Sequence, residues 1–187
     1  MDKKTDLRII KTKRNLYEGF ALLLAEKDYD SIKIKDICDK SLVNRSTFYD
    51  HYSSKKELLT SMIKNRQSEL TKNLDIKAMN TDNYREIYME YIKNLLNYID
   101  KSKEVNKKIL LKNNNNIAKE ILFNIIIDDI TKSLEKINKS DTPTELIAKF
   151  YVAGFSEVPC LYVEKPEIYT KEKVLDYTEK LLYKNTK

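Results

Sequence analysis

The sequence predicts an all-α fold, and three observations support that prediction. The chain of 187 residues contains only 2 Gly and 3 Pro, the two residue types that most strongly interrupt helices. Apolar residues recur at helical intervals through most of the chain, and the strict alternation typical of half-buried strands is nearly absent. The length is sufficient for one or two small domains, each with a proper core.

Four helices are expected in the N-terminal part of the chain. Their approximate ranges are 7–26, 33–40, 44–52 and 55–74. Residues that cap helices well mark three of their starts, namely Thr5 or Asp6, Asn44, and Ser53 or Ser54. The second and third helices are separated by the three residues 41–43, which is the spacing of a helix-turn-helix. Gly19, in the middle of the first helix, is expected where a neighbouring helix packs closely.

Five further helices are expected after a polar segment at residues 75–83. Their approximate ranges are 84–100, 103–112, 117–137, 143–165 and 170–184. Apolar residues almost surround the helix at 117–137, so we expect it in the middle of a bundle. Thr142 and Pro143 open the next helix, Pro159 is expected to kink it, and Thr170 caps the last one.

Residues 43–59 say most about function. The short helix that follows Asn44 carries side chains that donate or accept hydrogen bonds, and Phe48 alone points to an apolar interior. Those polar residues are Arg45, Ser46, Thr47 and Tyr49, and His51, Tyr52, Lys55 and Lys56 follow them. A short helix with polar groups at its N-terminal end, followed by basic residues, is suited to reading the major groove of DNA.

Residues 10–59 resemble the N-terminal domain of the tetracycline-repressor (TetR/AcrR) family of bacterial regulators. The matching residues are Leu16, Gly19, Phe20, Leu23, Tyr29, Ile32, Lys33, Ile34, Ile37, Val43, Asn44, Arg45, Ser46, Thr47, Phe48, Tyr49, His51, Tyr52, Lys55 and Leu58. One departure is Leu42, where the family usually has Gly. Either the turn has another geometry, or a left-handed Leu42 costs about 1 kcal/mol.

The resemblance implies DNA-binding residues and a two-part organisation. Base-facing side chains are implied at Asn44, Arg45, Ser46, Thr47 and Tyr49, with a further contact at Lys35. Phosphate contacts are implied at Tyr49, His51, Tyr52 and Lys55. Arg45 is the strongest candidate, because arginine can bind guanine O6 and N7 together. A DNA-binding domain is expected over residues 1–54 and a ligand-binding and dimerisation domain over residues 55–187.

The implied C-terminal domain matches the family only in length and helical character. Its last two helices are expected to form a homodimer, which would place two recognition helices in successive major grooves. Aromatic residues are candidates for an effector pocket, with core or interface packing as the alternative reading of the tyrosines. The candidates are Tyr88, Tyr91, Tyr98, Phe155 and Tyr162.

The residue inventory disfavours an enzyme. The chain has 1 His and 2 Cys, too few at metal-ligand spacing for a metal site, and only 2 Gly to build a phosphate loop. No cofactor is expected. The net charge of +6 is compatible with nucleic acid as a partner. The widely separated cysteines predict no disulfide, and no leader or membrane-spanning stretch is expected, so a cytoplasmic location is predicted.

We therefore predict a cytoplasmic, homodimeric, ligand-responsive transcription regulator, most simply a repressor of a palindromic DNA operator. Two alternatives stay open. One is a regulator of the same fold without a small-molecule effector, answering to a protein or acting as an activator. The other is a helical protein-interaction module that does not bind DNA.

Overall fold

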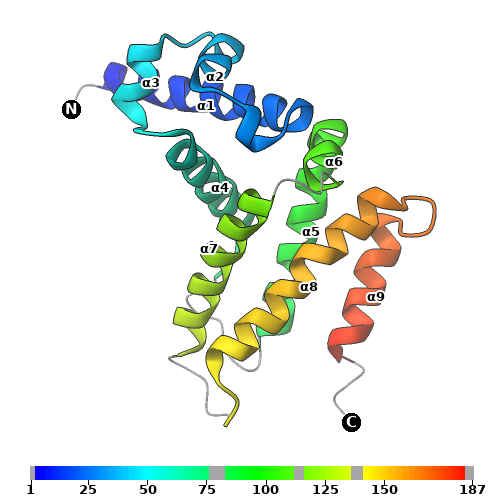
Figure 1. Ribbon diagram of the computed structural model, residues 1–187. Helices are drawn as coiled ribbons and strands as arrows, with labels where there is room; N and C mark the ends of the chain where they lie inside the picture. Colours follow the sequence, from blue (N-terminus) through cyan, green and yellow to red (C-terminus); the bar gives the residue numbers. More distant parts are fainter. Residues whose placement is uncertain (1–2, 76–82, 112–115, 136–140, 184–187) are drawn as a thin grey trace. The chain divides into compact units, whose positions relative to one another are not determined.

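A computed structural model describes residues 3–75, 83–111, 116–135 and 141–183, and every regular element in these ranges is helical (Figure 1). The predicted all-α class is confirmed. The helices are α1 (Lys3–Glu26), the 3-10 turn η1 (Tyr29–Ser31), α2 (Ile34–Ser41), α3 (Arg45–His51), α4 (Lys55–Thr71), α5 (Tyr84–Lys101), α6 (Lys103–Leu111), α7 (Asn116–Leu134), α8 (Thr144–Glu164) and α9 (Lys171–Tyr183).

The chain divides into two compact units. The first comprises Met1–Asn65 with Glu104–Ile121, and the second comprises Arg66–Lys103 with Leu122–Lys187. Helix α4 therefore begins in the first unit and ends in the second. The functional boundary between residues 54 and 55 remains a prediction.

The first unit has an apolar core built from α1, α2, α3 and the start of α4. Its fully buried side chains are Leu16, Phe20, Leu24, Ile32, Ile37, Phe48, Leu58 and Leu59. Helices α1 and α2 pack closely at Gly19, where an added Cβ would lie 2.3 Å from the Ser41 hydroxyl oxygen. The expectation that Gly19 marks a close helix approach is therefore confirmed.

The second unit is organised by contacts of α5 with α8 and α9 and of α8 with α9. Ile92, Leu96 and Ile99 of α5 are buried in its core, together with Val152 and Val163 of α8. A polar cluster also joins the three helices. The Tyr162 hydroxyl donates to Asp100 at 2.6 Å, and the Lys171 ammonium donates to the other carboxylate oxygen at 3.1 Å and to Asn97.

Helix ends differ from the sequence prediction in several places. Thr5 and Asp6 lie inside α1 instead of capping it, and α4 ends at Thr71, before Leu74. Pro143 occupies the N-cap of α8, so it precedes the first helical residue. These shifts are small because flanking turns can extend or shorten a helix without changing which residues are buried.

Two predicted caps hold. The Ser54 hydroxyl accepts a hydrogen bond from the Glu57 backbone N–H at 3.2 Å, which caps α4. The Thr170 hydroxyl accepts one from the Lys173 N–H at 3.4 Å, which caps α9. The Glu57 carboxylate also satisfies a backbone N–H at the start of α4, because it accepts a hydrogen bond from the Ser53 N–H at 2.7 Å.

Helix α7 is less enclosed than its composition predicts. Among its described side chains Ile126 is buried, whereas Ile117, Ile121, Ile125 and others are only half-buried. The prediction of a central bundle helix is therefore wrong for the single chain, because an apolar composition cannot tell a core position from an interface position.

Helix α8 is, by length and composition, apolar enough to span a membrane. The expectation that no segment reaches this length is therefore wrong. One such helix is weak evidence for a membrane, since core helices of soluble proteins meet the same criterion. The helix continues through Pro159.

Candidate nucleic-acid interface

The turn between α2 and α3 has a defined geometry that brings the two helices together. Leu42 adopts the left-handed conformation, with φ 54° and ψ 41°. The Val43 N–H donates to Cys38 O at 3.0 Å and the Leu42 N–H to Asp39 O at 3.4 Å. This is the hydrogen-bond pattern of a Schellman motif, which usually has Gly at the left-handed position. Of the two possibilities, strain at Leu42 is therefore the one found.

Helix α3 is held by a single apolar anchor. The Phe48 side chain is fully buried and packs near Tyr52, with ring centroids 6.1 Å apart. The Phe48 N–H donates to Asn44 O at 2.9 Å, so the helix is closed from its first turn. Because Phe48 fixes the rotation of α3 about its axis, the polar residues of the helix face outward together.

The predicted base-facing residues lie together on the surface around the start of α3. Asn44, Arg45, Ser46 and Tyr49 are exposed and Thr47 is half-buried. Asn44 stands at the N-cap position, but its side chain makes no capping hydrogen bond. The predicted side-chain cap is thus wrong, and the amide of Asn44 is not engaged in holding the helix.

Arg45 and Tyr49 form a pair on this surface. The Arg45 Nη2 donates to the Tyr49 hydroxyl at 3.4 Å, and the guanidinium carbon lies 5.6 Å from the centroid of the Tyr49 ring. The hydrogen bond to Tyr49 raises the pKa of Arg45, whose guanidinium is charged at physiological pH even without it. The cation is displayed on an exposed face where an anionic or electron-rich ligand can reach it.

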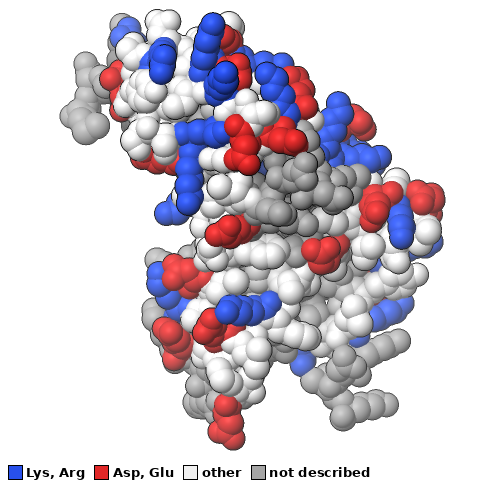
Figure 2. Space-filling model, in the orientation of Figure 1, with Lys and Arg blue, Asp and Glu red and all other residues white. Residues whose placement is uncertain are grey.

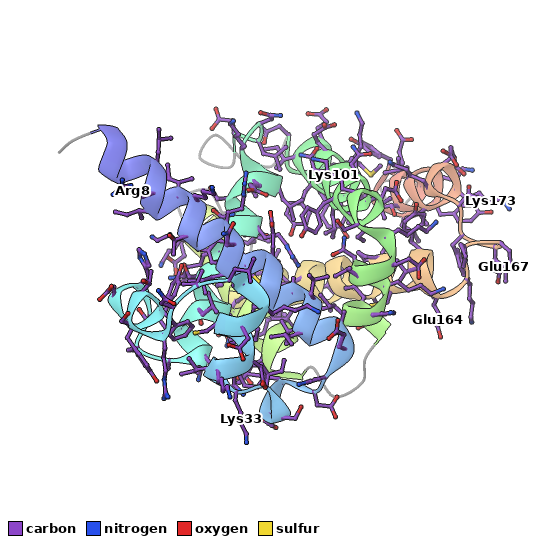
Figure 3. All side chains as sticks on the ribbon, turned by 90° about the horizontal axis from the view of Figure 1, so that it is seen from above. Arg8, Lys33, Lys101, Glu164, Glu167 and Lys173 are labelled. Carbon is purple, nitrogen blue, oxygen red and sulfur yellow. The ribbon has the colours of Figure 1, made fainter. Side chains whose placement is uncertain are left out.

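Helix α2 contributes further positive charge at its N-terminal end, opposite the end that leads into the turn. Lys35 is exposed in its first turn. Lys33, at the N-cap of α2, points outward from the N-terminal unit, as does Arg8 of α1 (Figure 3). The Lys33 backbone N–H donates to the Asp36 carboxylate at 3.0 Å, which fixes the start of α2 and lowers the pKa of Asp36.

Two of the predicted phosphate contacts point inward instead. The Tyr52 ring is buried, and its hydroxyl donates to the Tyr17 hydroxyl at 3.1 Å, while Tyr17 and Ser61 hydrogen-bond at 2.8 Å. Burial raises the pKa of the Tyr52 phenol. Its role in the structure is to join α1, the end of α3 and α4 through three hydroxyl groups.

Lys55 is the second inward-pointing residue. Its ammonium donates to the backbone oxygens of Tyr29 at 2.5 Å and Ile32 at 2.7 Å, and lies 4.1 Å from the Tyr29 ring centroid. Burial lowers the pKa of Lys55. His51, by contrast, is half-buried, with its ring centroid 6.2 Å from that of Tyr52. Contacts of these three residues with DNA stay a prediction.

Sequence reasoning missed the partners of Tyr52. Tyr17 and Ser61 lie 35 and 9 residues away along the chain, and no local motif links them to Tyr52. A hydroxyl on the inner edge of an amphipathic helix is the only sequence feature common to them. Such a feature predicts partial burial but does not identify the partner.

Charges on the N-terminal unit are mixed. In the face shown in Figure 2, Lys and Arg side chains are interspersed with Asp and Glu over this unit. Several acidic residues are paired with neighbours, including Glu26 with Lys40 at 3.0 Å and Asp36 with Lys27 at 3.8 Å. The placement of individual cations, more than their number, therefore determines where an anion can bind.

All five candidate effector residues belong to the second unit. The side chain of Phe155 lies outside the described residues. Tyr88 and Tyr91 of α5 are buried, and the Tyr91 hydroxyl donates to Gln67 at 2.9 Å. Tyr98 is half-buried beside Arg66, whose guanidinium carbon lies 4.5 Å from its ring centroid. Tyr162 is bonded to Asp100, and burial together with this carboxylate raises its pKa to about 12.

Within the described residues, no three His, Cys, Asp or Glu side chains come together as a metal site would require. Cys38 is buried and Cys160 is half-buried, and neither forms a disulfide.

Comparison with known proteins agrees with the geometry of α2 and α3. Residues 21–62 match the family model described as bacterial regulatory proteins, tetR family. Over this segment the chain resembles the TetR family. The match spans α2, the turn and α3, so it rests on the same residues that form the candidate interface.

Two curated proteins resemble the chain over part of its length. An uncharacterized HTH-type transcriptional regulator, YxbF of Bacillus subtilis, is 45% identical over 78 residues, covering 41% of this chain and 20% of that protein. The Transposon Tn10 TetC protein of Escherichia coli is 30% identical over 87 residues, covering 43% and 44%. The match therefore spans less than half the length of each of these relatives.

Solved structures extend the likeness in fold to nearly the whole chain. The transcriptional regulator FadR from Bacillus subtilis, solved in complex with stearoyl-CoA, aligns with a TM-score of 0.61 at 19% identity. The alignment covers 90% of this chain and 96% of that one. An identity this low shows the fold alone.

Proposed function

We propose that this chain is a homodimeric, ligand-responsive transcription regulator that represses by binding a palindromic DNA operator. The observation that carries the proposal is the outward-facing polar set of α3, held in one orientation by buried Phe48. A protein-interaction module would instead be expected to show apolar residues on this helix. The fold of a TetR-family regulator supports the same assignment.

In the proposed complex, Arg45 reads a guanine edge, and Asn44, Ser46 and Thr47 contact neighbouring bases or phosphates. Lys35 adds a contact from α2. Tyr52 and Lys55 remain predicted phosphate contacts, although their polar ends are hydrogen-bonded inside the domain. They support the interface by fixing how α3 and the start of α4 sit on α1.

The proposed homodimer forms through α8 and α9. Apolar side chains remain exposed along both helices, among them Phe150 at 75% and Leu181 at 69%. Leu146, Phe150 and Leu161 share one face of α8, at spacings close to whole helical turns. A soluble monomer would leave this apolar surface in water, which a twofold interface removes.

The proposed effector binds in the second unit near the aromatic residues of α5 and α8. Tyr88 of α5 approaches α8 at Gly154, where an added Cβ would lie 3.3 Å from its hydroxyl. Tyr91 adds a buried hydroxyl bonded to Gln67. Mixed aromatic and polar groups suit an amphipathic ligand. Because the neighbouring FadR structure holds stearoyl-CoA, acyl-CoA thioesters are the first class to screen.

DNA binding is tested by fluorescence anisotropy with the duplex that flanks the protein's own gene and with a scrambled duplex of the same composition. We expect binding to the flanking duplex to be tighter by at least about 10³-fold and to weaken steeply as salt rises. Arg45→Ala should lose most of this preference. Equal weak binding of both duplexes by the wild type, repeated with other promoter fragments, would contradict the proposal.

The same complexes test the two alternatives. A regulator without a small-molecule effector would bind the operator, yet its melting temperature would not rise with any member of a metabolite and acyl-CoA library. A pure interaction module would bind neither duplex selectively. Sedimentation of the free protein tests the dimer, with Phe150→Lys expected to shift it to monomer because the charge would be buried in the interface.

A further inference from the structure

The contact between Arg45 and Tyr49 suggests that the two residues have different roles in α3. The two residues are one helical turn apart, and both are exposed. A long arginine side chain on an exposed helix normally samples many rotamers, and binding must immobilise it. Here the hydroxyl of Tyr49 accepts a hydrogen bond from Nη2 at 3.4 Å, and the ring lies beside the guanidinium, so those rotamers are restricted before any ligand arrives.

Tyr49 can restrain Arg45 because the tyrosine is itself restrained by the core. Its ring meets the buried ring of Phe48 edge to face, with centroids 5.5 Å apart and planes at 86°. Phe48 has no exposed surface. The position of the guanidinium is thus set through two aromatic contacts that lead back to the interior of the domain.

We propose that Tyr49 is a positioning residue that holds the Arg45 guanidinium ready for bidentate pairing with a guanine in the major groove. This inference rests on the proposed function, because it assumes that α3 reads DNA. One hydrogen bond to Tyr49 leaves the other N–H groups of Arg45 free, and a fork of two parallel donors is what guanine O6 and N7 accept. Tyr49 therefore contributes to base preference without touching the base.

The expected effect is moderate and selective. Immobilising a flexible side chain on binding commonly weakens affinity by roughly twofold to tenfold, and preorganisation removes part of that loss. Removing the Tyr49 hydroxyl should accordingly weaken operator binding by roughly twofold to tenfold. The loss should appear at the guanine that Arg45 reads and leave preference at other base pairs unchanged.

The test uses an operator selected by the wild-type full-length protein from random duplexes. Affinities of wild type, Tyr49→Phe, Tyr49→Leu and Arg45→Ala are measured against that operator and against each single base-pair substitution. We expect Tyr49→Phe to reduce discrimination at one base pair in each half-site, and Tyr49→Leu, which also removes the ring, to reduce it further. In the Arg45→Ala background, Tyr49→Phe should change nothing.

Other outcomes overturn the inference. An equal loss at every base pair, with a shallower dependence on salt and the same size in the Arg45→Ala background, would make Tyr49 a phosphate ligand instead. If Tyr49→Leu lost neither operator affinity nor base-pair discrimination, Tyr49 would have no role in DNA recognition. Failure of the wild type to select a sequence would contradict the proposed function itself. Tyr169 is a partly exposed tyrosine just before α9, and Tyr169→Phe is the matched control. We expect this variant to bind the operator with unchanged affinity. Thermal melting confirms that each variant folds.

Discussion

Leu42 carries backbone strain that a single substitution should relieve. Its left-handed conformation, with φ 54°, brings Cβ too close to the backbone and costs about 1–2 kcal/mol for a residue other than Gly. The side chain is 93% exposed, so replacing it loses almost no buried apolar surface. Gly removes the Cβ but adds about 0.5–1 kcal/mol of backbone entropy to the unfolded state. Leu42→Gly should therefore stabilise the fold by roughly 0.5–1 kcal/mol.

Thermal unfolding followed by circular dichroism measures this gain. For a chain of this size the melting temperature should rise by about 1–4 °C. Leu42→Ala is the matched control, because it removes the exposed side chain and retains the Cβ, and its stability should equal that of the wild type. If Leu42→Gly lowered the melting temperature, or if Ala raised it as much as Gly, the strain argument would be refuted.

Three further predictions concern packing and hydrogen bonds inside each unit. Gly19→Ala should destabilise the protein by about 1–3 kcal/mol, since the new methyl would overlap the buried Ser41. Gly154→Ala should change the free energy of unfolding by no more than about 1 kcal/mol. Chemical denaturation measures both free energies. Tyr91→Phe should cost about 1–3 kcal/mol because it leaves the buried Gln67 oxygen without its donor, and Tyr169→Phe should leave the melting temperature unchanged. Burial alone would raise the pKa of Asp100, but hydrogen bonds from Tyr162 and Lys171 outweigh it and hold that pKa below its usual value. The advantage of wild type over Asp100→Asn should thus be present above about pH 4 and vanish as the pH falls through the folded pKa, and a pH-independent difference would contradict this assignment.

Local chemistry explains which parts of the fold could be predicted from the sequence. Periodic apolar residues such as Leu16, Phe20 and Leu23 indicate the buried face of α1, and the structure buries all three. Ser54 and Thr170 indicate helix starts because a hydroxyl can satisfy an N–H within its own turn. Asn44 has the same capacity, yet its side chain is not used, since the backbone of the motif already closes α3.

Orientation of polar residues was harder to predict than their position. Tyr52 and Lys55 stand where the family resemblance implies phosphate contacts, but each has a long side chain that can reach either solvent or the interior. Their inward orientation depends on partners distant in sequence, namely Tyr17 for Tyr52 and the carbonyls of η1 for Lys55. The burial of α7 was hard to predict for the same reason. Its apolar residues predict that the helix packs against another surface, but they do not identify that surface.

Above all, we propose that α3 reads DNA sequence through Arg45. The most direct measurement is the ratio of affinities for the selected operator and a scrambled duplex, determined for wild type and Arg45→Ala at several salt concentrations. We predict a ratio of at least about 10³ for the wild type and a much smaller ratio for the variant, and we expect salt to weaken DNA binding by both proteins. An unchanged ratio in Arg45→Ala would contradict it.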